Sequence, residues 1–365
     1  GTRFAKVTRP GSILKPGMRC RKDYCRHRYS SAQAWNADQS LLVIVNGCDG
    51  LCFLDGQTYE PLFRRNEPGA CEWHTLDPDT MICILNDAIV DWKPRSNRFT
   101  VIWKSDAYTQ LRFGPGKGNL SRDGKSIAIR ARQSPGETVA FAFDIAGRKK
   151  YPDINLDRLS GKNSYVSISP TGRYIFVFQK QVERVQQAYV FAIDGRLIQH
   201  WPEHHRPGHG DMTIDENGDE VFVGISKSEP DKYHVIKRRL EDGKVTVLAP
   251  YGSGSHVSAR NINRKGWVFV SYGGTYEKLV GRRNRAPFYQ EVIALRIDGS
   301  GQVRRIAHTR SAAHNYRSET HASASPDGSQ VIWSSNWGLA GGPVADFVSR
   351  VDWSDHRTIR SLRTE

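Results

Sequence analysis

Four of the twelve histidines in this 365-residue chain stand at the start of predicted strands that open separate repeats of the sequence. They are His74, His209, His256 and His321. Imidazole changes charge near neutral pH, so it can accept or donate a proton in catalysis, and its neutral form binds divalent metals. A single histidine at a strand start is usually structural, but four at equivalent places in different repeats favour one shared site. The remaining histidines that we considered are predicted to lie on the surface: His27, His204, His205 and His314.

A metal site is one chemistry that these histidines allow. His256, Glu319 and His321 would offer two imidazoles and a carboxylate, a donor set that suits Mn, Zn and similar divalent ions. The three residues come from different repeats, so their spacing along the chain does not decide whether they meet. We therefore expect a divalent metal (Mn, Ca or Zn) and no organic cofactor. The alternative is that these side chains hydrogen-bond only to one another.

Cationic and aromatic side chains fall in loops that are predicted at the same rim. Arginine forks grip carboxylates, and aromatic faces stack on sugar rings. The chain has 53 Lys and Arg against 38 Asp and Glu, and this net charge of +15 favours a polyanionic partner. The basic residues are scattered rather than gathered in a block, so we expect an acidic polysaccharide or oligosaccharide and no nucleic acid. The predicted substrate-binding residues are Arg130, Arg132, Asn163, Arg260, Tyr272, Tyr276 and Trp337.

A repeat positions these residues. A polar turn followed by a run of β-branched or aromatic residues recurs seven times, at residues 36–40, 77–80, 121–125, 169–173, 215–219, 263–266 and 325–329. The apolar runs have the length of strands rather than helices, and each turn suits a hairpin between two of them. A further strand pair follows each hairpin. The pattern predicts an all-β fold, a seven-bladed β-propeller with four-stranded antiparallel blades, although six or eight blades remain open.

The domain organisation follows from the repeats. Residues 1–34 precede the first repeat and are predicted to pack on the propeller as an N-terminal segment, and residues 35–365 are predicted to form the propeller itself. The last blade is expected to take its four strands from residues 322–362.

The cysteines indicate the cellular compartment in which the protein folds. All six lie in the first quarter of the chain, and the pairs Cys20–Cys25 and Cys48–Cys52 are close enough for local disulfides. No Met and no apolar leader open the chain, which predicts a processed export product. We therefore expect a periplasmic or secreted protein. No apolar run is long enough to span a membrane, and we expect a monomer.

From about Trp35 onward, the chain resembles the propeller-type polysaccharide lyases. Three features carry the resemblance: the turns of the Ser-Pro-Asp-Gly type, His209 and His256 at the start of successive blades, and the segment ETHASASPDG at 319–328. The pattern is most similar to that of the oligogalacturonate lyases, with the ulvan lyases and the rhamnose–glucuronate lyases as structural relatives.

This resemblance implies roles for particular residues. In oligogalacturonate lyases a segment similar to 319–328 supplies metal-binding histidines, and an earlier blade supplies another that matches His256. The family also uses an arginine as the catalytic base and a histidine on the next blade. Arg184 and His209 stand at a similar separation in this chain.

The chain departs from that pattern at the metal. Only His321 fits cleanly, because Glu319 and Tyr316 stand where the family has other ligands. The ulvan-type lyases use a histidine and a tyrosine for proton transfer and an arginine that neutralises the substrate carboxylate. Resemblance to them implies catalytic roles for His74, Tyr165, His209 and Arg184.

Together these features predict a carbon–oxygen lyase that cleaves a uronate polymer by β-elimination and leaves an unsaturated uronate. Removal of the C5 proton needs a neutralised carboxylate, a base, and an acid for the leaving oxygen. Two alternatives stay open. One is a non-catalytic propeller that binds an acidic glycan or a protein at the same rim. The other is a glycoside hydrolase with Asp211 and Glu319 as its two carboxylates.

Overall fold

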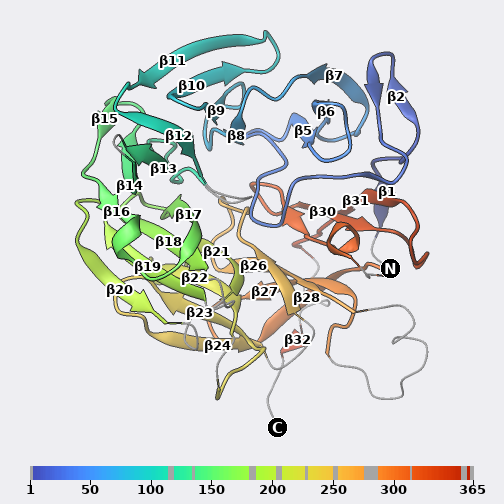
Figure 1. The fold of residues 1–365 in the computed structure, drawn as a ribbon. Coiled ribbons are helices and arrows are strands. Elements are labelled where there is room, and N and C mark those ends of the chain that lie inside the picture. Colours follow the sequence, from blue (N-terminus) through green and yellow to red (C-terminus); the bar gives the residue numbers. More distant parts are fainter. Residues whose placement is uncertain are drawn as a thin grey trace.

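The computed structural model describes residues 3–113, 119–133, 136–180, 186–202, 208–226, 229–249, 254–274, 287–312, 315–354 and 360–361. Within these ranges nearly all regular structure is β-strand, and the helices are two 3-10 turns, η1 (Leu156–Arg158) and η3 (Tyr316–Ser318). Seven mainly antiparallel sheets surround a common axis, and the colours in Figure 1 advance from sheet to sheet around the ring. The chain is therefore a seven-bladed β-propeller, as the repeats predict.

The first four blades follow the order of the chain. Blade one contains β5 (Leu41–Ile44), β6 (Leu51–Asp55) and β7 (Pro61–Arg65), and Trp35 extends it by a bridge to Leu42. Blade two contains β8 (Ala70–Trp73), β9 (Met81–Ile84), β10 (Ala88–Lys93) and β11 (Arg98–Lys104). Blade three contains β12 (Tyr108–Arg112), β13 (Ser126–Gln133), β14 (Glu137–Asp144), β15 (Lys149–Lys150) and β16 (Ile154–Asn155). Blade four contains β17 (Lys162–Ile168), β18 (Tyr174–Lys180), β19 (Gln186–Ala192) and β20 (Leu197–Trp201).

The remaining blades continue the same order. Blade five contains β21 (Gly208–Ile214), β22 (Glu220–Ile225), β23 (Val235–Arg239) and β24 (Val245–Ala249). Blade six contains β25 (Gly254–Ser258), β26 (Trp267–Tyr272), β27 (Glu291–Arg296) and β28 (Gln302–His308). Blade seven contains β29 (Ser323–Ala324), β30 (Gln330–Ser335) and β31 (Val344–Arg350). In blades two, four and five the first strand (β8, β17 and β21) lies nearest the centre of the ring in Figure 1.

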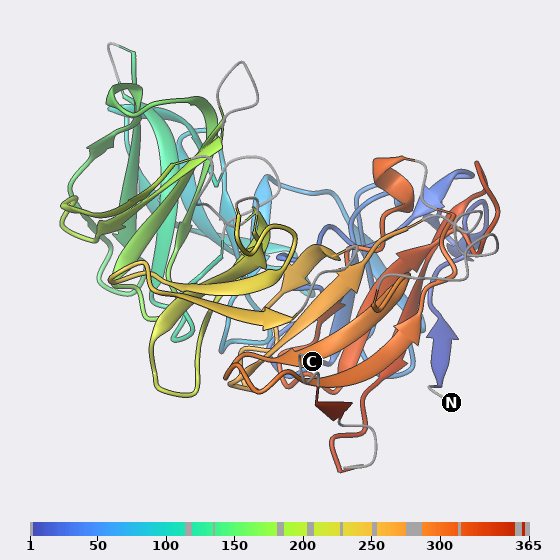
Figure 2. The ribbon, with the colours of Figure 1, turned by 90° about the horizontal axis from the view of Figure 1, so that it is seen from below.

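The ring closes through the N-terminus. Strand β1 (Phe4–Lys6) pairs with β31 and completes blade seven, and β4 (Tyr24–Cys25) also pairs with β31. Both views show the blue N-terminal strand beside the red strands (Figures 1 and 2). The expectation that residues 322–362 supply all four strands of the last blade is wrong. Strand β32 (Arg360–Ser361) pairs with β28 at the edge of blade six instead.

The N-terminal segment also forms a separate hairpin of β2 (Ile13–Lys15) and β3 (Met18–Arg19). Division of the chain into a segment of residues 1–34 and a propeller of residues 35–365 stays a prediction. The pairing of β1 and β4 nevertheless brings residues of this segment to the last blade, next to the strands that carry the candidate site.

The core lies between neighbouring blades. Strand β22 is buried along its whole length, because blade six packs on the face that carries Val223 and blade four packs on the face that carries Phe222. Val223 of β22, Val257 of β25 and Val270 of β26 belong to one apolar cluster. A strand that is covered on both faces has a continuous apolar sequence. This explains why an apolar run comes directly after each polar turn of the repeat.

All six cysteines form disulfides. The bridges Cys20–Cys25 and Cys48–Cys52 confirm the two predicted local pairs, and the third bridge joins Cys71 to Cys83. The last two residues face each other in the β8–β9 ladder. Among the described residues, no helix has the length and apolar character that a membrane crossing requires.

Candidate functional site

Three histidines from three neighbouring blades meet at one rim of the ring: His209 in β21, His256 in β25, and His321 just before β29. Nδ1 of His209 lies 3.3 Å from Nε2 of His256, and the ring centroids of His256 and His321 are 4.2 Å apart. Oε2 of Glu319 lies 3.1 Å from Nε2 of His321 and 3.6 Å from Nε2 of His256. We call these four residues the histidine cluster. The structure thus brings together four side chains that the sequence singles out.

The members of the histidine cluster differ in burial. His256 and His321 are buried, whereas His209 is exposed and Glu319 is partly exposed. Burial raises the pKa of Glu319 above its usual value. Burial also lowers the pKa of His321 far below its usual range, and His256 and Arg26 add to this effect. His321 is therefore a neutral imidazole at neutral pH.

The backbone of two cluster residues is unusual. His209 has a φ of 50° and His321 a φ of 45°, in the left-handed region that residues other than glycine rarely adopt. Such conformations persist only where the surroundings hold them, and they are concentrated at functional sites. For His321, a hydrogen bond from a buried neighbour holds the backbone in this conformation.

That neighbour is His27. Its Nε2 donates to the carbonyl oxygen of His321 at 2.7 Å, and its Nδ1 lies 3.0 Å from Oδ1 of Asp346. Ser334 donates to the same carboxylate oxygen at 2.6 Å. The prediction that His27 lies on the surface is wrong, because His27 is fully buried where the N-terminal segment folds against blade seven. His204, His205 and His314 lie outside the described residues.

Two further residues of the N-terminal segment reach the histidine cluster. A guanidinium nitrogen of Arg26, Nη2, contacts Nδ1 of His321, and Nη1 donates to the carbonyl oxygen of Arg317. The ring centroid of Tyr29 is 5.2 Å from that of His256 and 4.7 Å from that of His321. Sequence reasoning missed both residues because they stand outside the repeats. The dense run of cationic and aromatic residues at 26–29 was the one available signal.

The hydrogen-bond partners assign the protons in this cluster. Ser255 Oγ donates to the carbonyl oxygen of Ser271 at 3.1 Å, so it accepts from Nδ1 of His256, which lies 3.1 Å away. His256 therefore carries its proton on Nδ1, and its Nε2 accepts from Nδ1 of His209. This leaves Nε2 as the acceptor nitrogen of His209. A buried chain of hydrogen bonds thus orients an exposed imidazole as a base.

The metal-binding capacity of the cluster can be tested on the same grounds. One donor atom from each of His256, Glu319 and His321 lies within 4.8 Å of the others, so the spacing allows these residues to hold one metal ion. A histidine that ligates a metal usually donates its other ring N–H to an oxygen acceptor. His256 satisfies this rule through Ser255, whereas Nδ1 of His321 faces a guanidinium donor of Arg26. His321 as it stands therefore does not fit the role of a ligand.

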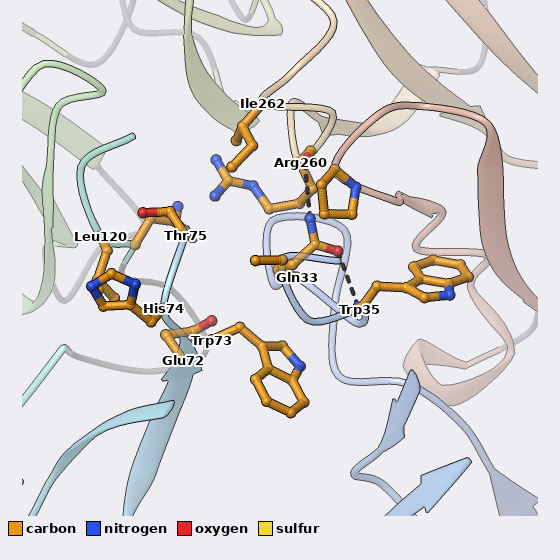
Figure 3. Close-up of a pocket in the computed structure, with 12 residues that line it drawn as sticks. Gln33, Trp35, Glu72, Trp73, His74, Thr75, Leu120, Arg260 and Ile262 are labelled. Carbon is orange, nitrogen blue, oxygen red and sulfur yellow. Dashed lines mark hydrogen bonds between the residues drawn. The ribbon is translucent and has the colours of Figure 1, made fainter. Parts of the chain in front are cut away.

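A separate small pocket lies where blades two, three and six meet the N-terminal segment (Figure 3). Its cavity of about 20 Å³ has room for about one water molecule. Figure 3 shows the side chain of Gln33 between Trp35 and Arg260, with Nε2 donating to the carbonyl oxygen of Arg260 at 2.9 Å. The guanidinium of Arg260 binds both carboxylate oxygens of Asp211 at 2.8 Å. Arg260, predicted to bind substrate, thus forms a buried ion pair.

His74 lines this pocket rather than the histidine cluster. Trp73 pairs with Met81, the first residue of β9, so His74 lies at the turn end of its strand. Its Nδ1 accepts from the backbone N–H groups of Leu76 and Asp77 at 3.2 and 2.9 Å. The prediction that His74 stands at a position equivalent to that of the other three histidines is therefore wrong by several residues. Its predicted catalytic role stays untested.

Glu72 in the pocket gives the chain a pH-dependent stability. Burial raises the pKa of Glu72 to about 7, although Nη1 of Arg28 lies 3.3 Å from its Oε1. Between the ordinary carboxyl pKa and pH 7, the folded state binds more protons than the unfolded state, so stability falls as pH rises. We expect Glu72→Gln to be more stable than wild type at pH 8 by up to about 3 kcal/mol, with the advantage fading toward pH 5. Urea unfolding at a series of pH values measures this.

The exposed Glu60 provides the matched control, because Glu60→Gln should leave the pH dependence of stability unchanged. Parallel pH profiles for wild type and Glu72→Gln would contradict the assignment of a raised pKa to Glu72.

The other predicted residues have various placements. Tyr165 occupies in blade four the place of His256 in blade six, since each pairs with the fifth residue of the next strand, Phe178 and Ser271. Asn163 lies on β17, Arg130 and Arg132 lie on β13, and the ring of Tyr272 is buried against Phe288. Trp337 is 42% exposed. Arg184 and Tyr276 lie outside the described residues.

Comparison with known proteins shows the fold alone. No protein-family model matches the chain, and no curated protein matches it in sequence. An oligogalacturonate lyase from Vibrio parahaemolyticus has a similar structure, with a TM-score of 0.61 and 10% identity over 97% of this chain and 94% of that one. The WD40 domain of Pan2 from Neurospora crassa matches with a TM-score of 0.51 and 13% identity over 96% of this chain and 94% of that one.

A chain of a mitotic checkpoint complex is also similar, with a TM-score of 0.54 and 10% identity over 96% of this chain and 95% of that one. The neighbours thus include a lyase, a WD40 domain and a chain of a mitotic checkpoint complex. They establish the propeller and leave the chemistry to be argued from the site.

Proposed function

We propose that this protein is a polysaccharide lyase that cleaves an acidic, uronate-containing polysaccharide or oligosaccharide by β-elimination at the histidine cluster. The observation that carries the proposal is the chain of hydrogen bonds that orients exposed His209. Two histidines with a purely structural role would not need the tautomer of the exposed ring to be fixed in this way. The structural likeness to an oligogalacturonate lyase supports the proposal at the level of the fold.

In the proposed reaction, Nε2 of His209 accepts the C5 proton of a uronate. Nδ1 of His209 donates to Nε2 of His256 at 3.3 Å, and this contact holds the ring in the tautomer that leaves Nε2 basic. The positive charge that then forms on His209 faces the lone pair of His256, whose own proton is held by Ser255. His256 can therefore orient the base His209 without a metal ion.

The carboxylate of the substrate must be neutralised before its C5 proton can leave. The guanidinium of Arg26 places a permanent positive charge beneath the rim, and the net charge of +15 attracts a polyanion to it. Arg184, predicted from the sequence as a direct neutraliser or a base, remains part of the proposal.

Two tyrosines can protonate the leaving oxygen. Tyr165, predicted from the sequence, is 8% exposed and its ring stacks on Phe178 at 4.9 Å, whereas Tyr316 is 62% exposed with its ring centroid 4.8 Å from His321. Partial desolvation of the phenol raises the pKa of Tyr316, with a smaller contribution from Glu319, so the phenol stays protonated at neutral pH. On a natural glycoside, the phenylalanine variant of the donor should be about 10²–10⁴-fold slower.

A uronate with an acidic aryloxy leaving group at C4 needs no proton donor when the C4–O bond breaks, so it should restore most of the activity of that variant and of no other. Rate measurements on both substrates for Tyr165→Phe and Tyr316→Phe therefore identify the donor. Equal losses on both substrates would show that neither phenol protonates the leaving oxygen.

One alternative function is less well supported by the geometry. A hydrolase with Asp211 and Glu319 as its carboxylates would need Asp211 to exchange a proton or activate a water. Both oxygens of Asp211 are bound by Arg260, and Oδ2 also accepts from the backbone N–H of Ala259 at 2.9 Å. A carboxylate held in this way is a poor acid. A non-catalytic propeller that binds an acidic glycan stays the second candidate, because the structural neighbours also include a WD40 domain and a chain of a mitotic checkpoint complex.

The setting of this activity follows from the disulfides. Three bridges within the first quarter of the chain indicate folding in an oxidising compartment, so we place the protein in the periplasm or outside the cell. We propose that it acts as a monomer on a polyanionic substrate.

Ultraviolet absorbance of the unsaturated product tests the function. The purified protein would be incubated with pectate, ulvan, glucuronan, gum arabic, alginate and bacterial exopolysaccharides, and binding to each polymer would be measured in parallel at low and high salt. We expect absorbance to rise on at least one polymer and binding to weaken at high salt, because the attraction of surface charges is screened. Salt-sensitive binding without any rise would favour the glycan-binding alternative.

A further inference from the structure

A buried guanidinium stands at the centre of the candidate site. Arg26 is 3% exposed and contacts Nδ1 of His321 through Nη2, while Nη1 donates to the carbonyl oxygen of Arg317. Burial lowers the pKa of Arg26, and the groups that oppose this shift come from several elements: Asp346 of β31, Tyr316 of η3, Glu319 directly after it, and Tyr29 of its own segment. Arginine keeps its proton in proteins, so the site carries a fixed positive charge from the N-terminal segment.

This contact determines what His321 can do. A guanidinium N–H only donates, so Nδ1 of His321 accepts and its proton sits on Nε2. That Nε2 lies 3.1 Å from Oε2 of Glu319 and makes no regular hydrogen bond among the described residues. A metal ion at Nε2 would require the proton to move to Nδ1, where it would face the Arg26 donor.

Charge opposes a metal as well. A divalent cation held by His256, Glu319 and His321 would lie one imidazole ring away from the buried guanidinium. The like charges would repel across a region that excludes water, where electrostatic interactions are strong. The spacing of the three residues alone would allow a metal ion, so Arg26 is the group that opposes one.

We propose that Arg26 is a built-in cation that replaces a divalent metal in the histidine cluster, so that the site works without metal. Arg26 is a positioning residue: it acts through His321, whose ring it holds in the Nε2–H tautomer beside Glu319, and through its charge on a carboxylate bound at the rim. The catalytic part of this inference rests on the proposed function. The exclusion of metal does not.

Calorimetric titration with Mn²⁺ and with Zn²⁺ tests the exclusion directly. Wild type is expected to bind neither ion at the cluster, whereas Arg26→Ala should bind one equivalent at least 10²-fold more tightly. That gain should disappear in Arg26→Ala/His256→Ala. Arg26→Lys keeps the charge and should bind metal no better than wild type, which separates the charge from a loss of packing.

Measurements of the elimination rate provide a second test. A chelator should leave wild-type elimination unchanged, and Arg26→Ala should lower kcat while Arg26→Lys restores part of it. Tight binding of one metal ion by wild type that is lost in His321→Ala would overturn the proposal even if no Arg26 variant folds. Metal exclusion by wild type with no elimination on any polymer would instead leave this inference standing and reject the proposed function.

Discussion

His209→Ala is expected to lower the rate of elimination by about 10²–10⁴-fold, the usual contribution of a single general base. His209 is oriented by the hydrogen-bond chain through His256 and Ser255, and it is the exposed histidine among the described members of the cluster. Initial rates on the best polymer measure the effect. KM should change less than kcat, because a base that removes the C5 proton acts in the transition state.

His200 provides the matched control for that variant. It is an exposed histidine on the edge strand β20 of blade four, where it stacks on Tyr189 and bonds Gln187. His200→Ala should keep wild-type activity. If His209→Ala also keeps it, the base lies elsewhere and the orientation of His209 has another purpose.

The second large effect concerns stability. Asp211→Ala should destabilise the fold by about 3–5 kcal/mol, because it leaves the guanidinium of Arg260 buried without its partner. The pair links the inner strand of blade five to the end of that of blade six, with N–O distances of 2.8 Å and side chains at most 8% exposed. Denaturant unfolding monitored by tryptophan fluorescence measures the loss.

Asp23 and Arg317 form the comparison pair. They also lie 2.8 Å apart, but their side chains are about 60% exposed. Asp23→Ala should therefore change stability by less than about 1 kcal/mol, since water solvates and screens an exposed pair. Similar losses for the two variants would mean that burial does not determine the value of the Asp211–Arg260 pair.

The fold was predictable because the turns carry strong local chemistry. Gly218 and Gly328 adopt φ values of 87° and 70°, which favour glycine, and Ser325 and Asp327 bond within their own turn. Each such turn fixes the register of the strands on either side. The same regularity places His209, His256 and His321 at one rim, so their meeting could be expected from the spacing.

The rest of the site could not be read from the repeats. Arg26, His27 and Tyr29 reach the cluster from a segment with no period of its own, and only ring closure through β1 and β4 brings them there. Long-range contacts of this kind leave no local signal in a single sequence. His74 was misplaced for the opposite reason, since a short inner strand in blade two put it near the turn.

The most direct test of the central claim is mass spectrometry of products formed in heavy-oxygen water. Elimination breaks the C4–O bond without adding water, so β-elimination predicts an unsaturated product and a saturated product, neither carrying the label from the cleavage step. Incorporation of heavy oxygen at the new reducing end, beyond simple exchange of a preformed reducing sugar in the same water, would show hydrolysis and contradict the lyase proposal. An intact polymer with salt-sensitive binding would contradict it equally, in favour of a propeller that only binds.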